Sequence, residues 1–234
     1  MKLSLVILAG GLGKRLGQIT KKVPKALIDI SGKPFISRQL DYLKHQGFQN
    51  IIICTSYQGD KIRNFVGNGS KFKLNISYSD DGDKLLGTGG CIKKALKKLK
   101  ENFFILYGDT FLPINFSLVE KAFFEEGKPA LMTILKNIDQ WDKSNAYFEN
   151  KRVSYNKKNP TKDMNYIDYG LTVVNNSIFN DFPDEQSFDI ADVYEKLSKK
   201  KLLAGYEVKE RFYEIGSESG LIETIKFFKK EKKV

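Results

Sequence analysis

A buried strand and a glycine-rich loop are encoded side by side in residues 3–16, which read LSLVILAGGLGKRL. The apolar run from Leu3 to Ala9 is short and rich in branched side chains, and Gly10 and Gly11 end it. Such a run is typical of a strand buried on both faces, as in a parallel sheet. Glycines placed directly after it let the backbone approach a ligand closely and offer its N–H groups to phosphate oxygens.

The alternation of strand and helix continues through the first half of the chain. Three further apolar runs predict strands, and apolar residues at helical spacing predict helices between them. The strands are expected at 51–54, 74–78 and 103–107, and the helices at 36–43, 62–66 and 92–99. This order predicts an α/β fold, a Rossmann-like sheet covered by helices on both faces. Ligands of such sheets bind at the carboxyl ends of the strands, where Gly10 and Gly108-Asp109 would lie.

The second half changes character, because its apolar runs are shorter and polar loops interrupt them. Strands are expected at 130–135, 146–149, 152–156 and 169–174, and helices at 190–197 and 221–228, the last with Ser217 as its N-cap. We interpret this half as a lobe continuous with the first sheet, so that a mixed, mostly parallel sheet forms a single domain over residues 1–234.

Composition excludes several classes of protein. The chain has 39 Lys and Arg against 28 Asp and Glu, a formal net charge of +11, which suggests an anionic partner such as nucleic acid, an acidic membrane or a phosphorylated small molecule. Many lysines fall on outward faces of predicted helices, as in 93–100, which favours an ordinary solvated surface. No apolar run is long enough for a membrane span or resembles a signal peptide, so a cytoplasmic protein is expected.

The small number of histidines and cysteines limits the kinds of catalytic and metal site that the chain can form. His45 is the only histidine, so triads and zinc sites built on histidine clusters lack their partners. Cys54 and Cys91 are expected to be small core residues of a reduced protein, one on a strand and one on a helix. An enzyme built from this chain would depend on carboxylates, lysines, arginines and backbone amides.

The glycine loop fits neither of two common nucleotide motifs. Residues 10–13 read Gly-Gly-Leu-Gly, which is not G-x-G-x-x-G, and no G-x-x-x-x-G-K-[ST] is present. Arg15 and Lys25 supply two cations, as needed to neutralise a triphosphate while a bond to its α-phosphorus breaks. The alternative is a glycine-rich turn with surface cations.

Taken together, these residues resemble the sugar-1-phosphate nucleotidylyltransferase family. Its opening pattern, L-A-G-G-x-G-x-R-L, then T-x-x-x-P-K and K-P, is matched by residues 8–16, by Thr20 with Pro24-Lys25, and by Lys33-Pro34. Lys14 stands where many members have threonine, and Gln18 where many have proline. Residues 86–90, Leu-Gly-Thr-Gly-Gly, are similar to the element that packs against base and ribose, and residues 107–110, Tyr-Gly-Asp-Thr, to the Gly-Asp whose aspartate holds Mg²⁺.

The resemblance implies an enzyme that joins a nucleoside triphosphate to a sugar 1-phosphate with Mg²⁺ and releases pyrophosphate. It implies a nucleotide-binding half at about 1–112 and a sugar-phosphate-binding half at about 113–234. Catalytic roles fall to Arg15, Lys25 and Asp109. Nucleotide contacts fall to Leu8, Ala9, Gly10, Gly11, Gly13, Lys14, Gly87, Thr88 and Gly89. Substrate contacts fall to Gly108, Asn145, Lys157, Asp168 and Gly170.

The second half departs from the hexose-type members, which usually carry E-K-P, N-x-G and D-x-G. The corresponding segments here read Ser-Tyr-Asn-Lys-Lys at 154–158, Ile-Asp-Tyr-Gly-Leu at 167–171 and Glu-Ile-Gly at 214–216. Lys157 is therefore the candidate for the sugar phosphate. Glu214 is a candidate second metal ligand or a structural residue, and Asp168 either faces the sugar hydroxyls or is a turn or metal-side residue.

This second-half pattern is closest to D-glycero-α-D-manno-heptose-1-phosphate guanylyltransferases and their mannose-1-phosphate relatives, which implies GTP and envelope glycan synthesis. Four alternatives stay open. They are a hexose 1-phosphate with dTTP, UTP or CTP, a non-sugar acceptor, a nucleic-acid or anion-binding protein, and an inactive regulatory paralogue. The lysine-rich helix at 92–99 lacks the aromatic residues of a nucleic-acid surface, and no nucleic-acid partner is expected. The sequence does not decide whether the protein forms a homodimer.

Overall fold

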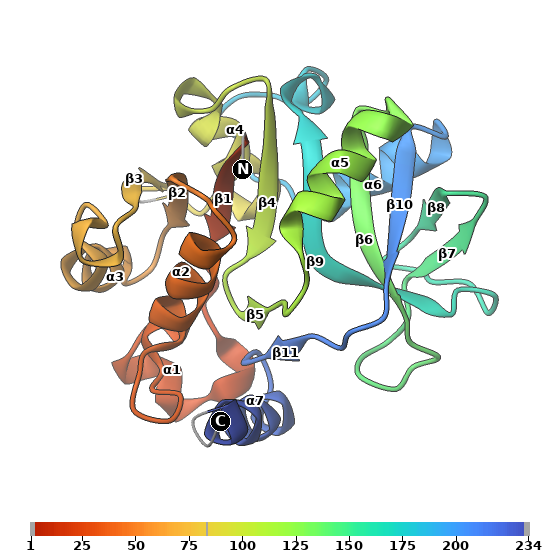
Figure 1. Ribbon diagram of the computed structural model, residues 1–234. Helices are drawn as coiled ribbons and strands as arrows, with labels where there is room; N and C mark the ends of the chain where they lie inside the picture. Colours follow the sequence, from red (N-terminus) through yellow and green to blue (C-terminus); the bar gives the residue numbers. More distant parts are fainter. Residues whose placement is uncertain (1–2, 83, 232–234) are drawn as a thin grey trace.

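The computed structural model describes residues 3–82 and 84–231. Its main strands are β1 (Ser4–Leu8), β2 (Asn50–Thr55), β3 (Asn75–Asp80), β4 (Asn102–Tyr107), β6 (Ala130–Lys136), β7 (Ala146–Glu149), β8 (Arg152–Tyr155), β9 (Tyr166–Asn175) and β10 (Leu203–Val208). They form one sheet in the order β3-β2-β1-β4-β9-β6-β10-β8-β7 (Figure 1). Its helices are α1 (Gln18–Lys22), α2 (Phe35–His45), α3 (Gly59–Val66), α4 (Gly87–Ala95), α5 (Phe116–Glu126), α6 (Ile190–Lys199) and α7 (Glu218–Glu231).

The first half forms the parallel part of the sheet, as the sequence predicted. β1 lies between β2 and β4, so that Val6 pairs with Ile52 on one side and Ile105 on the other. Val6 is completely buried, because helices cover both faces of the sheet at this point. The carboxyl ends of β1, β2, β3 and β4 therefore lie along one edge, where the glycine loop begins.

The second half makes the sheet mixed. β9 runs antiparallel between β4 and β6, β10 is parallel to β6, and β7 and β8 form an antiparallel pair at the far edge. α5 and β10 were missed in the sequence analysis. Phe116, Val119 and Phe123 do have helical spacing, and Asn115 caps α5 by accepting the N–H of Ser117.

The helices form two layers around the sheet. α2, α3 and α5 contribute Leu40, Ile62 and Phe123 to one core, and α4 and α6 contribute Ile92 and Tyr194 to the core on the other face. None of the helices among the described residues has the length and apolar character needed to cross a membrane.

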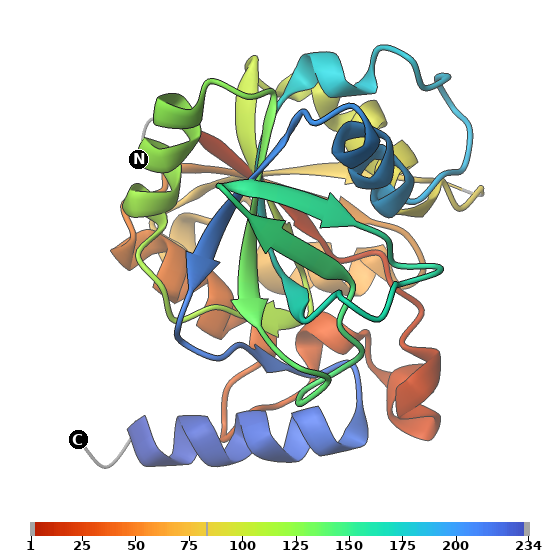
Figure 2. The same ribbon diagram turned by 90° about the vertical axis from the view of Figure 1, so that its right-hand side faces the viewer.

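A third core lies below the sheet, where α7 packs (Figure 2). It joins Leu16, Phe35 and Phe228 with Phe111 of β5 (Thr110–Phe111) and Ile215. The Ser217 hydroxyl accepts the N–H of Gly220 at 3.0 Å, which confirms the predicted N-cap. The N–H of Ile215 donates to the carbonyl of Asp109 at 2.9 Å, so the segment that leads into α7 lies beside the end of β4.

Candidate active site

The glycine loop after β1 is held by side chains from outside it. The Ser56 hydroxyl, just beyond β2, donates to the carbonyl of Gly10 at 2.5 Å. The buried Thr20 hydroxyl donates to the carbonyl of Gly13 at 3.0 Å. Gly13 has a φ of +63°, and a Cβ on it would lie 2.5 Å from Thr20 Cγ2. Because a Cβ is excluded by both conformation and space, the loop needs glycine here.

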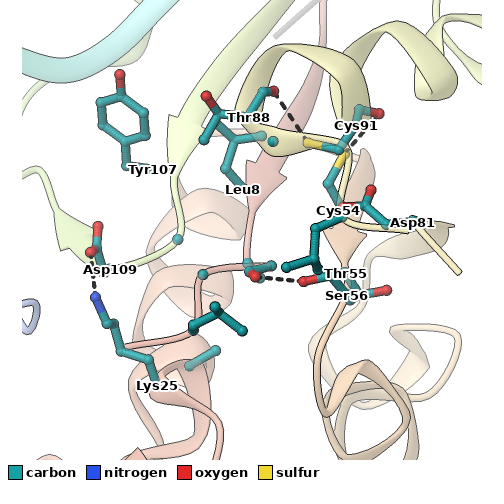
Figure 3. Close-up of a pocket in the computed structure, with 18 residues that line it drawn as sticks. Leu8, Lys25, Cys54, Thr55, Ser56, Asp81, Thr88, Cys91, Tyr107 and Asp109 are labelled. Carbon is teal, nitrogen blue, oxygen red and sulfur yellow. Dashed lines mark hydrogen bonds and ion pairs between the residues drawn. The ribbon is translucent and has the colours of Figure 1, made fainter. Parts of the chain in front are cut away.

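A cavity of about 300 Å³ opens beside this loop (Figure 3). Its walls come from the carboxyl ends of β1, β2 and β4, the turn after β3 and the first turns of α4. The lining residues are Leu8, Ala9, Gly10, Gly11, Leu12, Lys25, Ala26, Cys54, Thr55, Ser56, Asp81, Leu85, Gly87, Thr88, Cys91, Tyr107, Gly108 and Asp109. This cavity, which we call the first cavity, lies where a doubly wound sheet binds its ligand.

The two cysteines lie together on the wall of the first cavity. Cys54 ends β2 and Cys91 lies in α4, and the Cys54 thiol points to the carbonyl of Cys91 at 3.7 Å. Its hydrogen bond with Cys91 and its burial raise the pKa of the Cys54 thiol well above its usual range. Both thiols are free and buried, as predicted. Their adjacency could not be predicted, because it depends on how α4 packs against β2.

Lys25 and Asp109 form an ion pair at one end of the first cavity. Lys25 starts the 3-10 helix η2 (Lys25–Leu27), and its Nζ lies 2.9 Å from Oδ2 of Asp109. Asp109 follows β4 after Gly108, whose N–H donates to the carbonyl of Leu8 at 3.0 Å. A Cβ on Gly108 would lie 2.5 Å from that carbonyl oxygen, so a glycine is required for β4 to pass so close to β1.

The side chains of Glu214 and Arg15 also lie close to Asp109. Glu214 lies in β11 (Tyr213–Glu214), which pairs with β5 so that Glu214 faces Thr110. A Cβ on Gly216 would lie 2.7 Å from Glu214 Oε2, 2.9 Å from Arg15 Nη2 and 3.2 Å from Asp109 Oδ2. Two carboxylates and a guanidinium therefore surround Gly216.

The Glu214 carboxylate also caps α7. Its Oε2 accepts the N–H of Gly216 and, at 3.1 Å, the N–H of Ser217, while Oε1 accepts the Ser217 hydroxyl. Among residues 3–82 and 84–231, no cluster of three or more His, Cys, Asp or Glu is arranged to hold a metal ion. The hydrogen bonds to Gly216 and Ser217 give Glu214 the structural role considered for it.

A second cavity of about 460 Å³ lies next to the first, between β9, β11 and the loops around β7 and β8. It is lined by Arg15, Thr88, Tyr107, Asp109, Thr110, Trp141, Asp142, Asn145, Tyr155, Lys157, Ile167, Asp168, Tyr169, Gly170, Phe212, Glu214, Ser217 and Ser219. Thr88, Tyr107 and Asp109 line both cavities. The two spaces therefore meet at the end of β4.

Asp168 of the second cavity is held by hydrogen bonds from both sides of β9 and from its own backbone. Its Oδ1 accepts the N–H of Gly170 at 2.9 Å, its Oδ2 accepts the Tyr107 hydroxyl at 3.2 Å, and its own N–H donates to Asn145 Oδ1 at 2.9 Å. Burial raises the pKa of Asp168 to about 6, although these donors act in the opposite direction. Asp168 lies within β9, so the turn interpretation was wrong: the residue is part of a ten-residue strand.

A chain of polar contacts links the two halves of the site. The Thr88 hydroxyl donates to Asp189 Oδ1 at 2.7 Å, and Asp189 Oδ2 lies 3.6 Å from Lys157 Nζ. Asp189 also caps α6 by accepting the N–H of Ala191 at 3.0 Å. The side chain of Lys157 is about half exposed, at 53%. Asp189 therefore joins the start of α4 to the lysine beside the second cavity.

The structure brings most of the predicted site residues to these cavities. Leu8, Ala9, Gly10, Gly11, Lys25, Gly87, Thr88, Gly108 and Asp109 line the first, and Arg15, Asn145, Lys157, Asp168, Gly170 and Glu214 line the second. Gly13 and Gly89 line neither. A Cβ on Gly89 would lie 2.2 Å from the Phe188 ring, so Gly89 permits helix packing. Lys14 starts the 3-10 helix η1 (Lys14–Leu16), and its side chain lies outside the described part of the chain.

Several lining residues were missed. Ser56 and Asp81 directly follow β2 and β3, and their position at strand ends was the signal that could have found them. Trp141 and Tyr155 belong to loops and short strands of the second half. No periodic pattern marked these two, because their place in the site depends on the fold of distant segments.

The chain is similar to known proteins over most of its length. A family model described as nucleotidyl transferase matches residues 4–231. The chain is 32% identical over 212 residues to a D-glycero-α-D-manno-heptose 1-phosphate guanylyltransferase of Campylobacter jejuni, covering 90% of this chain and 93% of that protein. It is 31% identical to the enzyme of the same name from Aneurinibacillus thermoaerophilus, covering 90% and 92%.

The fold is also similar to that of solved structures. The crystal structure of HddC from Yersinia pseudotuberculosis superimposes with a TM-score of 0.82 at 25% identity, covering 97% of this chain and 99% of that one. A structure of HddC complexed with GMP-PN has a TM-score of 0.80 with the same coverage. The predicted single α/β domain of nucleotide-diphospho-sugar transferase type is thereby confirmed.

Proposed function

The chain belongs to the nucleotidyl transferase family, and from this premise we propose that it joins GTP to a heptose or mannose 1-phosphate and releases pyrophosphate. The reaction class, nucleotidyl transfer to a sugar 1-phosphate, is that of the relatives at 32% and 31% identity. One observation carries the proposal furthest: the two cavities share Thr88, Tyr107 and Asp109 in their linings. Two substrates, one in each cavity, would meet beside Asp109.

The first half would bind the nucleotide and the second half the sugar phosphate. Amides of the loop at Gly10 and Gly11 would face the triphosphate near Lys25. In the second cavity, Lys157 would contact the acceptor phosphate. Asp168 would face the sugar hydroxyls, because each of its oxygens keeps a second lone pair beside the hydrogen bond from Gly170 or Tyr107.

The reaction needs no side-chain base. An oxygen of the sugar 1-phosphate forms a bond to the α-phosphorus, the bond from that phosphorus to the oxygen bridging to the β-phosphorus breaks, and pyrophosphate leaves with the electron pair. The attacking phosphate is already an anion, so the main barrier is repulsion between two polyanions. Arg15 and Lys25 would offset this repulsion and stabilise charge on the leaving group.

The two carboxylates beside Gly216 suit a divalent metal ion. Glu214 Oε2 and Asp109 Oδ2 lie 2.7 Å and 3.2 Å from the position of a Cβ on Gly216, and the Arg15 guanidinium, 2.9 Å from that position, would move aside for the ion. Mg²⁺ is held in proteins by one or two carboxylates together with substrate phosphates and water. Asp109 and Glu214 would hold Mg²⁺, which would neutralise charge on the triphosphate.

The test is a pyrophosphate-release assay with Mg²⁺, crossing GTP, CTP, UTP, ATP and dTTP with a panel of sugar 1-phosphates. The panel includes mannose 1-phosphate and D-glycero-α-D-manno-heptose 1-phosphate. Release that requires GTP together with one of these two sugars is the expected result. Release with another base or a hexose phosphate would replace the proposed substrates. If no pair of substrates releases pyrophosphate but calorimetry still shows a bound triphosphate, the result would favour a non-sugar acceptor or a regulatory paralogue.

A further inference from the structure

Asp189 is an acid near both cavities to which the mechanism above gives no role. It directly precedes α6, and the residues on either side of it are tied to the start of α4. The N–H of Gly89 donates to the carbonyl of Phe188 at 2.9 Å, and the N–H of Ile190 donates to the Thr88 hydroxyl at 2.9 Å. Thr88 lies beside the first cavity (Figure 3). The backbone around Asp189 is therefore fixed against α4.

The Asp189 carboxylate uses its two oxygens differently. Oδ1 accepts the Thr88 hydroxyl at 2.7 Å and the N–H of Ala191 at 3.0 Å, so two hydrogen bonds hold this oxygen in place. Oδ2 lies 3.6 Å from Lys157 Nζ. Burial acts to raise the pKa of Asp189, but the Ala191 N–H, the Thr88 hydroxyl and Lys157 together lower it below its ordinary value. A charged carboxylate with a fixed position therefore faces the lysine.

The side chain of Lys157 has few other contacts that could fix it. It is 53% exposed, and among the described residues only the Asp189 carboxylate forms an ion pair with its ammonium group. A lysine that moves freely must be ordered when it binds a phosphate, and this ordering costs affinity. An ammonium group has three N–H donors, so pairing with Asp189 leaves donors for a phosphate. The ion pair therefore orders the lysine and keeps it able to bind an anion.

We propose that Asp189 is a positioning residue, which holds the ammonium group of Lys157 at the second cavity for the phosphate of the acceptor. The inference rests on the proposed function, because that function assigns the acceptor phosphate to Lys157. The hydrogen bond from Thr88 also fixes Asp189, and through it Lys157, relative to the start of α4 and the first cavity. Holding two substrates in a fixed relative geometry is a major source of rate enhancement.

Asp189→Asn removes the charge and keeps the cap of α6. The amide oxygen can still accept from Thr88 and Ala191, but the amide nitrogen then presents N–H groups to Lys157, which cannot accept them. We expect KM for the sugar 1-phosphate to rise about 3- to 10-fold, which corresponds to the cost of ordering one long side chain on binding. KM for GTP and the melting temperature should stay near their wild-type values.

Asp192→Asn is the matched control. Asp192 lies in the first turn of α6 and forms an ion pair with Lys158, the neighbour of Lys157 in the chain. Neither Asp192 nor Lys158 lines the first or the second cavity. This variant should leave KM for the acceptor unchanged, because it removes an equivalent charge from the same helix without affecting the pair at Lys157.

A double-mutant cycle shows whether Asp189 acts through the lysine. Lys157→Met should raise KM for the acceptor, and adding Asp189→Asn to it should raise KM no further. If Asp189 only stabilised the surrounding structure, the two effects would add. A wild-type acceptor KM in Lys157→Met would remove the assignment of the phosphate to Lys157, and this inference with it.

Acetylation by acetic anhydride reports on the ion pair without any turnover. Mass spectrometry gives the labelling rate of Lys157 relative to Lys158. This ratio should rise about two- to threefold in Asp189→Asn and fall by a similar factor in Asp192→Asn, because a lysine paired with a carboxylate is labelled more slowly.

The two readouts separate this inference from the proposed function. If wild type releases pyrophosphate but Asp189→Asn has an unchanged or lower KM for the acceptor, the inference is wrong and the proposed function stands. If wild type releases no pyrophosphate with any sugar phosphate, the proposed function is wrong, and the labelling ratio alone decides whether Asp189 holds Lys157. An unchanged labelling ratio in Asp189→Asn overturns the inference in either case.

Discussion

Lys25 Nζ lies 2.9 Å from Asp109 Oδ2, although 84 residues separate the two in the chain. The contact joins the segment after the glycine loop to the end of β4, which the pairing of β1 with β4 brings together. The side chains are 15% and 32% exposed, so solvent only partly screens their charges. This ion pair marks the point where the first and second cavities meet.

Asp109→Asn should keep the fold and lower kcat by about two orders of magnitude or more, since it removes the charge proposed to hold Mg²⁺. Turnover is measured by pyrophosphate release at saturating Mg²⁺, and the fold by melting temperature. Asp181→Asn is the control, because Asp181 forms an exposed ion pair with Lys196 away from both cavities. Equal activity of Asp109→Asn and wild type at matched Mg²⁺ would remove the metal assignment.

Variants of Glu214 should distinguish its hydrogen bonds to Gly216 and Ser217 from its proposed role as a metal ligand. Glu214→Gln keeps an oxygen that can accept the N–H groups of Gly216 and Ser217, so the melting temperature should change little. The Mg²⁺ concentration for half-maximal rate should rise about tenfold, a typical cost of altering a metal site. Glu214→Ala should in addition lose about 1 kcal/mol of stability, as a missing N-terminal cap does. An unchanged Mg²⁺ dependence in Glu214→Gln would leave only the capping role.

Asp168 should make stability depend on pH. Burial raises its pKa to about 6 in the folded state, against 3.8 for an unperturbed carboxyl. The folded chain therefore holds the proton more tightly than the unfolded chain, so this residue lowers stability as the pH rises from about 4 to about 6. Asp168→Asn removes the buried charge and should raise the melting temperature more at pH 7.5 than at pH 4.5. An equal change at both pH values would contradict the assignment.

Protonation of Asp168 should also weaken binding of the sugar 1-phosphate. Below pH 6 one oxygen of Asp168 carries a proton and has less capacity to accept from a sugar hydroxyl, so KM for the sugar 1-phosphate should rise as the pH falls through about 6. The acceptor phosphate also titrates near this pH, with a second pKa of about 6. Asp168→Asn is therefore the comparison, since it retains only the contribution of the substrate. Identical pH profiles of KM in the two proteins would rule out titration of Asp168.

Trp141 should report on acceptor binding. It is the single tryptophan of the chain and lines the second cavity, with the Arg211 guanidinium 3.7 Å from its ring centroid. Adding the sugar 1-phosphate should change intrinsic fluorescence in a saturable way, because it changes polarity beside the indole. Adding GTP alone should change it much less. A signal that follows GTP and ignores the acceptor would contradict the proposed use of the second cavity.

Much of the fold could be predicted because its signals are local. The run from Leu3 to Ala9 predicts a buried strand without reference to any distant residue, and β1 lies there. The predicted strand at 146–149 coincides with β7. α5 and β10 were missed, since helical spacing at 116–123 was not used and the burial of 203–208 depends on pairing with β6.

The amino-acid sequence was sufficient for the strand and helix order, the glycine loop and the identity of Arg15, Lys25 and Asp109, because each depends on residues close together in the chain. Tertiary structure alone set which of these groups meet. It placed Glu214 at Asp109 through the pairing of β5 with β11, and Asp81 beside Cys54 and Cys91 through the packing of strand ends against α4. Such contacts depend on backbone register and helix packing, which join residues by position in space, so no spacing in the sequence encodes them.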